Sequence, residues 1–219
     1  MISNFNRFIF KKKKEKVLNI YLSKFSDKKT KIFCKDFKKI FPNSNVILIS
    51  FNDIKFVTQV YLDKDSVIIV LYSEKKKKKI NFSIRSSKNG FEFHFIVKNI
   101  CSIDNVRFTG NSSRWAKTIL SLDKHFHTVP HLRLIKPLLI ELVESKINHV
   151  KSEAYFENLI SFFFYNSRIW FRNYQIKFYK KNNKNLIKFI EIGPRFSFSL
   201  KKAKDKFGNP MILNQIKIK

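Results

Sequence analysis

Residues 80–98 alternate between apolar and polar side chains on both sides of a turn-forming segment. The alternation runs from Ile80 to Ile84, stops at residues 86–90 (SSKNG), and resumes from Phe91 to Val97. A period of two is typical of a half-buried β-strand, and Asn-Gly tolerates the positive φ of a tight hairpin turn. The segment therefore predicts a β-hairpin, which commits the chain to a fold that contains an antiparallel sheet.

Other segments predict further strands and a few helices. Helical spacing of apolar residues predicts helices over 29–41, 51–62 and 131–143. The apolar stripe of the last of these is expected to face the core, a groove for a second protein being the minority reading. Strands are predicted at residues 17–22, 46–50 (a buried strand), 66–72, 156–164, 168–179, 186–192 and 196–200. This mixture predicts an α/β fold of the α+β kind.

The elements divide the chain into a central folded region with a basic tail at each end. We expect tails at 1–16 and 201–219, the second poorly ordered, and a folded region at 17–200 made of two halves, about 17–100 and 101–200. Residues 101–130 have few periodic apolar positions, so no element is predicted there. Two cysteines, Cys34 and Cys101, are too few for a disulfide framework or a four-thiolate zinc site.

The net charge bears on the partner of this chain. Lys and Arg number 45 against 16 Asp and Glu, a formal charge of +29. Part of the lysine excess is attributable to codon bias, since Phe, Ile, Lys and Asn, whose codons are A/T-rich, dominate the composition. Even with this allowance, the excess positive charge creates a strong electrostatic field. Such a field favours a polyphosphate partner, RNA or DNA, over an anionic membrane surface. We expect no membrane-spanning segment, because no apolar run approaches about 20 residues.

Residues that could support catalysis or bind a metal are few. Glu141 and Glu144 share a helix face, and a solvated face is the favoured reading of this pair. His125, His127 and His131 are ligand types that suit zinc, but their spacing matches no standard finger. No P-loop and no nucleophile elbow are present. The sequence therefore predicts neither an enzyme, nor a cofactor, nor a small-molecule substrate.

One strand combines cations with aromatic rings. On a strand over 168–179, Arg168, Trp170, Arg172 and Tyr174 project from one face. Single-stranded RNA is bound by such platforms, in which charges contact phosphates and rings contact bases. A core position is the favoured reading of the two aromatics, and Arg172 is equally compatible with a structural role. Arg195 is either a turn anchor or an RNA contact, and Gly110-Asn111 either a plain turn or an anion contact.

Five segments then resemble a known family. They are residues 108–111 (FTGN), 120–123 (LSLD), 130–142 (PHLRLIKPLLIEL), 168–176 (RIWFRNYQI) and 190–196 (IEIGPRF). In this order they are similar to the Brix-domain family of ribosome assembly factors, over roughly 17–210. After Gly110-Asn111 the family has a Gly- and Pro-containing basic stretch, whereas this chain retains only the basic charge, at Arg114 and Lys117.

The resemblance implies a fold, a function and partners. Each half would be similar to the anticodon-binding domain of class II aminoacyl-tRNA synthetases. The chain would be a non-enzymatic factor in the nucleolus, and would bind large-subunit precursor rRNA beside other assembly factors, including an EBNA-binding-protein homologue. Separately from the resemblance, the compact chain and its A/T-biased composition suggest a reduced genome, such as that of an endosymbiont's relict nucleus. A structural ribosomal protein or a general rRNA-binding protein is the alternative. The residues expected to contact RNA are Asn111, Arg114, Lys117, Arg168, Arg172 and Arg195.

Overall fold

A computed structural model of the chain describes residues 17–50, 66–74, 79–86, 88–105, 108–111, 116–147 and 156–211. The first half contains β1 (Val17–Ser23), α1 (Lys28–Ile40), β2 (Ser44–Ile49), β3 (Ser66–Glu74), β4 (Lys79–Arg85) and β5 (Glu92–Cys101). The second contains β6 (Lys117–Leu122), α3 (His125–Thr128), α4 (Pro130–Ile147), β7 (Phe156–Tyr165), β8 (Arg168–Lys181), β9 (Lys184–Glu191), β10 (Arg195–Lys204) and β11 (Pro210–Met211). The predicted mixed α/β class is confirmed, while the predicted helix over 51–62 lies outside the described residues.

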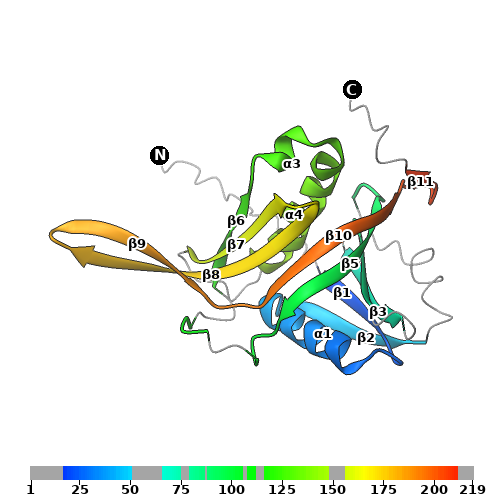
Figure 1. Cartoon of the computed structure of the whole chain (residues 1–219), viewed down its shortest axis with the longest axis horizontal. Helices are drawn as coiled ribbons and strands as arrows, with labels where there is room; N and C mark the ends of the chain where they lie inside the picture. The colour runs from blue at the N-terminus through cyan, green and yellow to red at the C-terminus, as the bar shows by residue number, and fades with distance from the viewer. Residues whose placement is uncertain are drawn as a thin grey trace, which may run out of the picture.

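The described strands form one sheet that runs through both halves (Figure 1). Its order is β2-β1-β3-β4-β5-β10-β8-β7-β6, with β9 paired to β8 and β11 paired to β10. β10 joins the halves, because it pairs antiparallel with β5 on one side and with β8 on the other. The division near residue 100, and the likeness of each half to an anticodon-binding domain, stay predictions.

Helix α1 confirms the helix predicted over 29–41. Asp27 caps its N-terminus, where the carboxylate accepts a hydrogen bond from the Thr30 backbone N–H at 2.8 Å. Phe33, Phe37 and Ile40 lie on its buried face, as the spacing predicted. Helix α4 likewise contains the predicted 131–143 segment and extends it at both ends.

The structure corrects the prediction of a buried strand over 46–50. β2 is the edge strand of the sheet and pairs only with β1 among the described strands. Ile47 and Leu48 are 40% and 58% exposed. The apolar run was interpreted as a buried strand, but an edge position leaves some of its side chains in solvent.

Three elements and part of a fourth were not predicted. β6 and α3 fall in the stretch 101–130, where the apolar periodicity is weak. β10 continues to Lys204 and β11 pairs with it, so residues 201–211 are partly strand although they were expected as tail. The strand continues because Lys202, Ala203 and Lys204 pair with β5.

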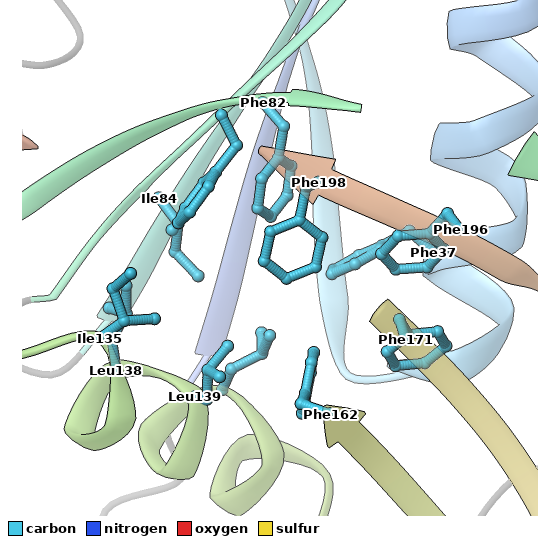
Figure 2. A pocket seen from close by; sticks show the side chains of 12 residues that line it. Phe37, Phe82, Ile84, Ile135, Leu138, Leu139, Phe162, Phe171, Phe196 and Phe198 are labelled. Carbon is cyan, nitrogen blue, oxygen red and sulfur yellow. The ribbon is translucent and has the colours of Figure 1, made fainter. Parts of the chain in front are cut away.

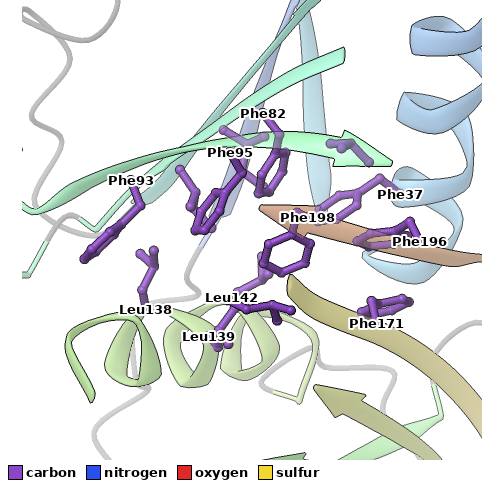
Figure 3. Close-up of a cluster of buried hydrophobic side chains, with 14 of the residues drawn as sticks. Phe37, Phe82, Phe93, Phe95, Leu138, Leu139, Leu142, Phe171, Phe196 and Phe198 are labelled. Atoms are coloured by element: carbon purple, nitrogen blue, oxygen red, sulfur yellow. The ribbon is translucent and has the colours of Figure 1, made fainter. Parts of the chain in front are cut away.

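Phenylalanine rings from both halves form a shared core (Figure 3). Phe198 of β10 lies 4.9 Å from Phe95 of β5 and 6.2 Å from Phe162 of β7, measured between ring centroids. Leu138, Leu139 and Leu142 of α4 pack onto the same cluster, which confirms that the stripe of this helix faces the core. One cavity of about 10 Å³ lies among these side chains, and its lining is apolar (Figure 2). A void this small and apolar is a dry packing defect rather than a ligand site.

The sheet also buries a carboxylate at the junction of the halves. Glu92 is 4% exposed, and its oxygens lie 2.9 Å from His94 Nε2 and 3.3 Å from Lys204 Nζ. Burial by itself raises the pKa of Glu92, but the interactions with His94 and Lys204 outweigh burial and hold this pKa below its ordinary value. Lys204 pairs with Glu92 across β10 and β5, so this ion pair ties the second half to the first.

Candidate nucleic-acid interface

The predicted one-sided display of β8 is confirmed. Ile169, Phe171 and Asn173 are buried, whereas the alternating residues between them are partly exposed. The favoured reading of Trp170 and Tyr174 as core residues is therefore wrong, because the strand turns them away from the phenylalanine cluster. The partly exposed residues of β8 are Arg168, Trp170, Arg172 and Tyr174.

Trp170 and Arg172 form a stack with a ring from the neighbouring strand. Phe163 of β7 is the register partner of Trp170, and the two rings lie nearly parallel at 7° with centroids 6.2 Å apart. The Arg172 guanidinium lies 5.5 Å from the Trp170 ring centroid and 5.9 Å from that of Phe163. Such cation–π contacts stabilise a guanidinium on a half-exposed surface and orient it.

A single carboxylate connects two of the predicted RNA contacts. Arg195 donates two hydrogen bonds to Glu191, from Nε at 2.7 Å and from Nη2 at 2.6 Å. Arg172 Nε lies 3.5 Å from the same carboxylate. The hydrogen bonds from Arg195 to Glu191 raise the pKa of this guanidinium. Because both guanidinium groups contact Glu191, the charges of Arg172 and Arg195 are already partly neutralised within the protein.

The same carboxylate also affects the adjacent Tyr174. Burial, followed by the charge of Glu191, raises the pKa of Tyr174.

The loop before β10 holds Arg195 in place. Gly193 has a φ of 65°, and its carbonyl accepts a hydrogen bond from Asn173 Nδ2 at 3.0 Å. A Cβ at Gly193 would lie 2.3 Å from the Phe108 ring, so the close approach of this ring requires glycine. The Phe108 ring in turn lies 5.6 Å below the Arg195 guanidinium. This anchoring agrees with the reading of Arg195 as a turn anchor and leaves an RNA contact as a proposal.

The remaining predicted contacts are spread over the sheet. The Asn111 backbone N–H donates to Gln175 Oε1 at 3.0 Å, and Gln175 Nε2 donates back to the Asn111 carbonyl. Lys117 begins β6 and lies 5.2 Å from the Phe156 ring, at the end of β7 opposite to Tyr165, the register partner of Arg168. The structure thus brings together Arg172 and Arg195 but not Lys117 and Arg168. Arg114 lies outside the described residues.

The three histidines considered as zinc ligands contact side chains of the protein. His125 Nδ1 lies 3.0 Å from Asp123 Oδ2, and His127 lies 3.3 Å from Lys136 Nζ. The His131 ring packs edge-on against Phe164, and burial lowers the pKa of His131. Among the residues that the structure describes, no three His, Cys, Asp or Glu side chains come together as a metal site requires.

The carboxylate pair of α4 does not form the solvated face that was favoured from sequence. Glu141 is 4% exposed and accepts a hydrogen bond from Ser86 Oγ at 2.6 Å. The contact joins α4 to the β4–β5 turn, so Glu141 has a structural partner across the two halves. Among the described residues, no helix is both long enough and apolar enough to cross a membrane.

Sequence reasoning did not identify Phe163, Phe108 and Glu191 as parts of this surface. Phe163 lies in an apolar run whose inward and outward members look alike in sequence. Glu191 contacts Arg172 only because β9 folds back beside β8 with Tyr174 opposite Glu191. Register across two strands sets these contacts, and the alternation within one strand does not reveal it.

The amino-acid sequence matches one protein-family model and several curated relatives. Residues 23–202 match the family model of the Brix domain. The chain is 30% identical over 204 residues to the human "Ribosome biogenesis protein BRX1 homolog", covering 92% of this chain and 56% of that protein. It is 30% identical over 145 residues to "Ribosome biogenesis protein brx1" of Schizosaccharomyces pombe, covering 66% and 49%. The chain thus spans about half the length of the curated relatives it matches.

Two archaeal structures resemble this fold. A probable ribosomal biogenesis protein from Aeropyrum pernix K1 aligns with a TM-score of 0.48 and 9% identity, covering 83% of this chain and 94% of the other. An archaeal Imp4-like protein aligns with a TM-score of 0.41 and 8% identity, covering 86% and 99%.

Proposed function

The chain belongs to the Brix-domain family, and from this premise we propose that it is a ribosome biogenesis factor that binds precursor rRNA of the large subunit. The observation that carries the proposal is the family match over residues 23–202, in a chain with a net charge of +29. The relatives named above are ribosome biogenesis proteins, and a strongly basic surface suits the phosphate backbone of RNA.

The role proposed is structural rather than catalytic. The factor holds immature rRNA in one geometry and leaves without turning over a substrate. It acts in the nucleolus beside other assembly factors, among them an EBNA-binding-protein homologue. Phosphate neutralisation by Lys and Arg dominates its affinity, so binding weakens steeply with salt.

The candidate interface contributes unequally to this binding. Arg168 has no carboxylate partner among the described residues, so its charge is available to a phosphate. Arg172 and Arg195 share Glu191, and an RNA phosphate near them competes with that carboxylate. The Arg172 guanidinium lies against the Trp170 and Phe163 rings, and these partly exposed rings offer a surface to an unstacked base.

Gradient sedimentation of the tagged full chain tests the proposal, together with identification of the RNA that it carries. The expected result is co-sedimentation with large-subunit precursors and absence from mature ribosomes. Presence in mature subunits would instead make it a structural ribosomal protein. Sedimentation with neither would refute the proposed function.

A binding titration gives an independent test of the same proposal. The affinity of the purified chain for rRNA fragments is expected to fall by orders of magnitude between about 50 and 200 mM salt, as for proteins with several phosphate contacts. A flat response would exclude phosphate-dominated binding.

A further inference from the structure

The distal part of the β8–β9 hairpin projects from the body of the molecule (Figure 1). β8 pairs with β7 only as far as Gln175 and with β10 only as far as Phe171, so beyond Gln175 its one described neighbour is β9. We define the arm as residues 177–188. The side chains from Lys177 to Asn185 are all exposed, and the arm contributes nothing to the phenylalanine core.

The arm collects lysines on one face. Lys177 lies opposite Lys188 in the β8–β9 register, and Lys181 lies opposite Lys184. Register partners share a face of the sheet, and alternate residues of one strand do too, so all four ammonium groups extend on the same side. The opposite face carries Phe178 and Ile187, which are 68% and 55% exposed, and a single lysine, Lys180, opposite Asn185.

No acidic residue balances these lysines within the arm. The segment between Tyr174 and Ile190 contains no Asp or Glu. The first carboxylate after it, Glu191, already binds Arg195 and Arg172. Like charges directly opposite each other destabilise a strand pair, so the two lysine pairs weaken a two-stranded hairpin that has little other support. An anion placed along this face would relieve the repulsion.

An aromatic ring lies between the two lysine pairs. Tyr179 shares the lysine face, lies opposite Leu186 and is 45% exposed. Every nucleobase offers a π-face to such a ring, whereas a duplex keeps its bases stacked on one another. Four cations around one exposed ring are therefore suited to a single strand of RNA, whose phosphates meet the lysines and one of whose bases stacks on the ring.

We propose that the lysine face of the arm is a binding site for single-stranded RNA. The inference rests on the proposed function. It adds to that function which structural element binds the RNA and that the bound RNA is single-stranded. The arm carries no base-specific donor or acceptor on this face apart from the Tyr179 hydroxyl, so the site selects single strands over duplexes rather than one sequence over another. The two-residue turn at Asn182 and Asn183, where φ is 50° and 58°, keeps the two strands in register at the tip.

The test compares two variants of the full chain that lose the same charge. The arm variant changes four lysines to glutamine, and the control changes four exposed lysines of α1 in the same way. Anisotropy with an unstructured labelled RNA is titrated across a range of salt concentrations. The arm substitutions are Lys177→Gln, Lys181→Gln, Lys184→Gln and Lys188→Gln, and the control substitutions are Lys28→Gln, Lys29→Gln, Lys31→Gln and Lys38→Gln.

The arm variant is expected to lose phosphate contacts that the control keeps. Each contact with single-stranded RNA contributes about 0.7 to the slope of log K against log salt, so four contacts reduce that slope by about 3. The control lowers affinity only through the general field and leaves the slope nearly unchanged. Equal losses in the two variants would overturn the inference. Circular dichroism serves to check that both variants remain folded.

Tyr179→Leu tests the stacking step separately. The substitution keeps an apolar side chain of similar reach and all four lysines. Affinity for single-stranded RNA is expected to fall about fivefold or more with the salt slope unchanged, because stacking on one ring contributes at least that factor. Unchanged affinity for the single strand, or an equal loss for a duplex, would overturn the single-strand assignment.

The outcomes separate this inference from the proposed function. If the unaltered chain binds RNA and the arm variant binds it equally well, the arm inference fails while the proposed function stands. If the unaltered chain binds no RNA, the proposed function fails as well. Binding to phosphatidylserine vesicles that requires the four arm lysines, without RNA binding, would assign the arm to an anionic membrane surface and overturn the inference.

Discussion

Replacing Phe198 by alanine should destabilise both halves of the molecule together. Phe198 is 3% exposed and lies on β10, between Val97 of β5 and Ile169 of β8. Its ring centroid is 4.9 Å from that of Phe95 and 6.2 Å from that of Phe162, so it contacts a ring from each half. The truncation therefore removes packing that the two halves share.

The size of the effect follows from the ring that is lost and the space it leaves. A buried Phe→Ala change typically costs about 3–5 kcal/mol in the free energy of unfolding. Phe198 also lines the existing void of about 10 Å³, so the new cavity adds to space that is already empty. We therefore expect a loss of about 4–5 kcal/mol, in the upper half of that range. Phe198→Leu keeps much of the packing and should cost about 1 kcal/mol.

Urea unfolding followed by two probes checks the expectation. Trp170 lies on β8, so its fluorescence reports the second half, while hydrogen exchange at β3 amides such as Ile69 reports the first. With an m-value of about 2 kcal/mol/M, Phe198→Ala should lower the midpoint by about 2 M in both probes. Benzene should raise the midpoint of Phe198→Ala only, by filling its apolar cavity. A loss below 1 kcal/mol, or full protection of β3 in the variant, would refute the reasoning.

Three further changes have expected outcomes. Asp27→Ala removes the cap of α1 and should lower the free energy of unfolding by about 1 kcal/mol, measured in urea against Asp27→Asn, which retains a capping oxygen. Gly193→Ala should cost at least about 1 kcal/mol in a thermal melt, because the positive φ disfavours a Cβ and the methyl meets the Phe108 ring; an unchanged melting temperature would contradict the close approach. The pKa of Glu92 is held below its ordinary 4.5, so its ionised form stabilises the fold above pH 4.5 and the stabilisation is lost as the pH falls through the folded-state pKa. Glu92→Gln should therefore be less stable at pH 7 by about 1–3 kcal/mol, through loss of the bond to Lys204, and should lose less on acidification; identical pH profiles would exclude this role.

The elements that sequence predicted well are those whose burial follows a clear period. The alternation over 168–179 correctly predicted the strand and that Arg172 shares a face with Trp170 and Tyr174, although the core position favoured for those two aromatics was wrong. Asn-Gly placed the β4–β5 turn. Tertiary position was harder to predict. Ile47 belongs to an apolar run that resembles a buried strand, yet its strand lies at an edge of the described sheet and its side chain is 40% exposed.

The candidate interface was predicted only in part, for a related reason. Sequence identified Arg172 and Arg195 as cations near aromatic residues, but their shared partner depends on how β9 is registered beside β8. No strand was predicted over residues 180–185, whereas Lys181 and Lys184 are register partners at the tip of a regular hairpin. A run of polar residues hides a strand when both of its faces are exposed, because no apolar period then marks it.

The place of β10 in the sheet bears on how the protein is made. Its partner β5 is complete at Cys101, whereas β10 begins only at Arg195. Roughly ninety residues separate these positions, which corresponds to about 5 to 20 seconds of translation at typical rates. Throughout that interval the nascent chain presents the open edge of β5, with Phe93 and Phe95 as yet uncovered by β10. Newly synthesised copies can therefore pair through this edge with one another. A chaperone that covers the edge of β5 for some seconds would prevent such pairing.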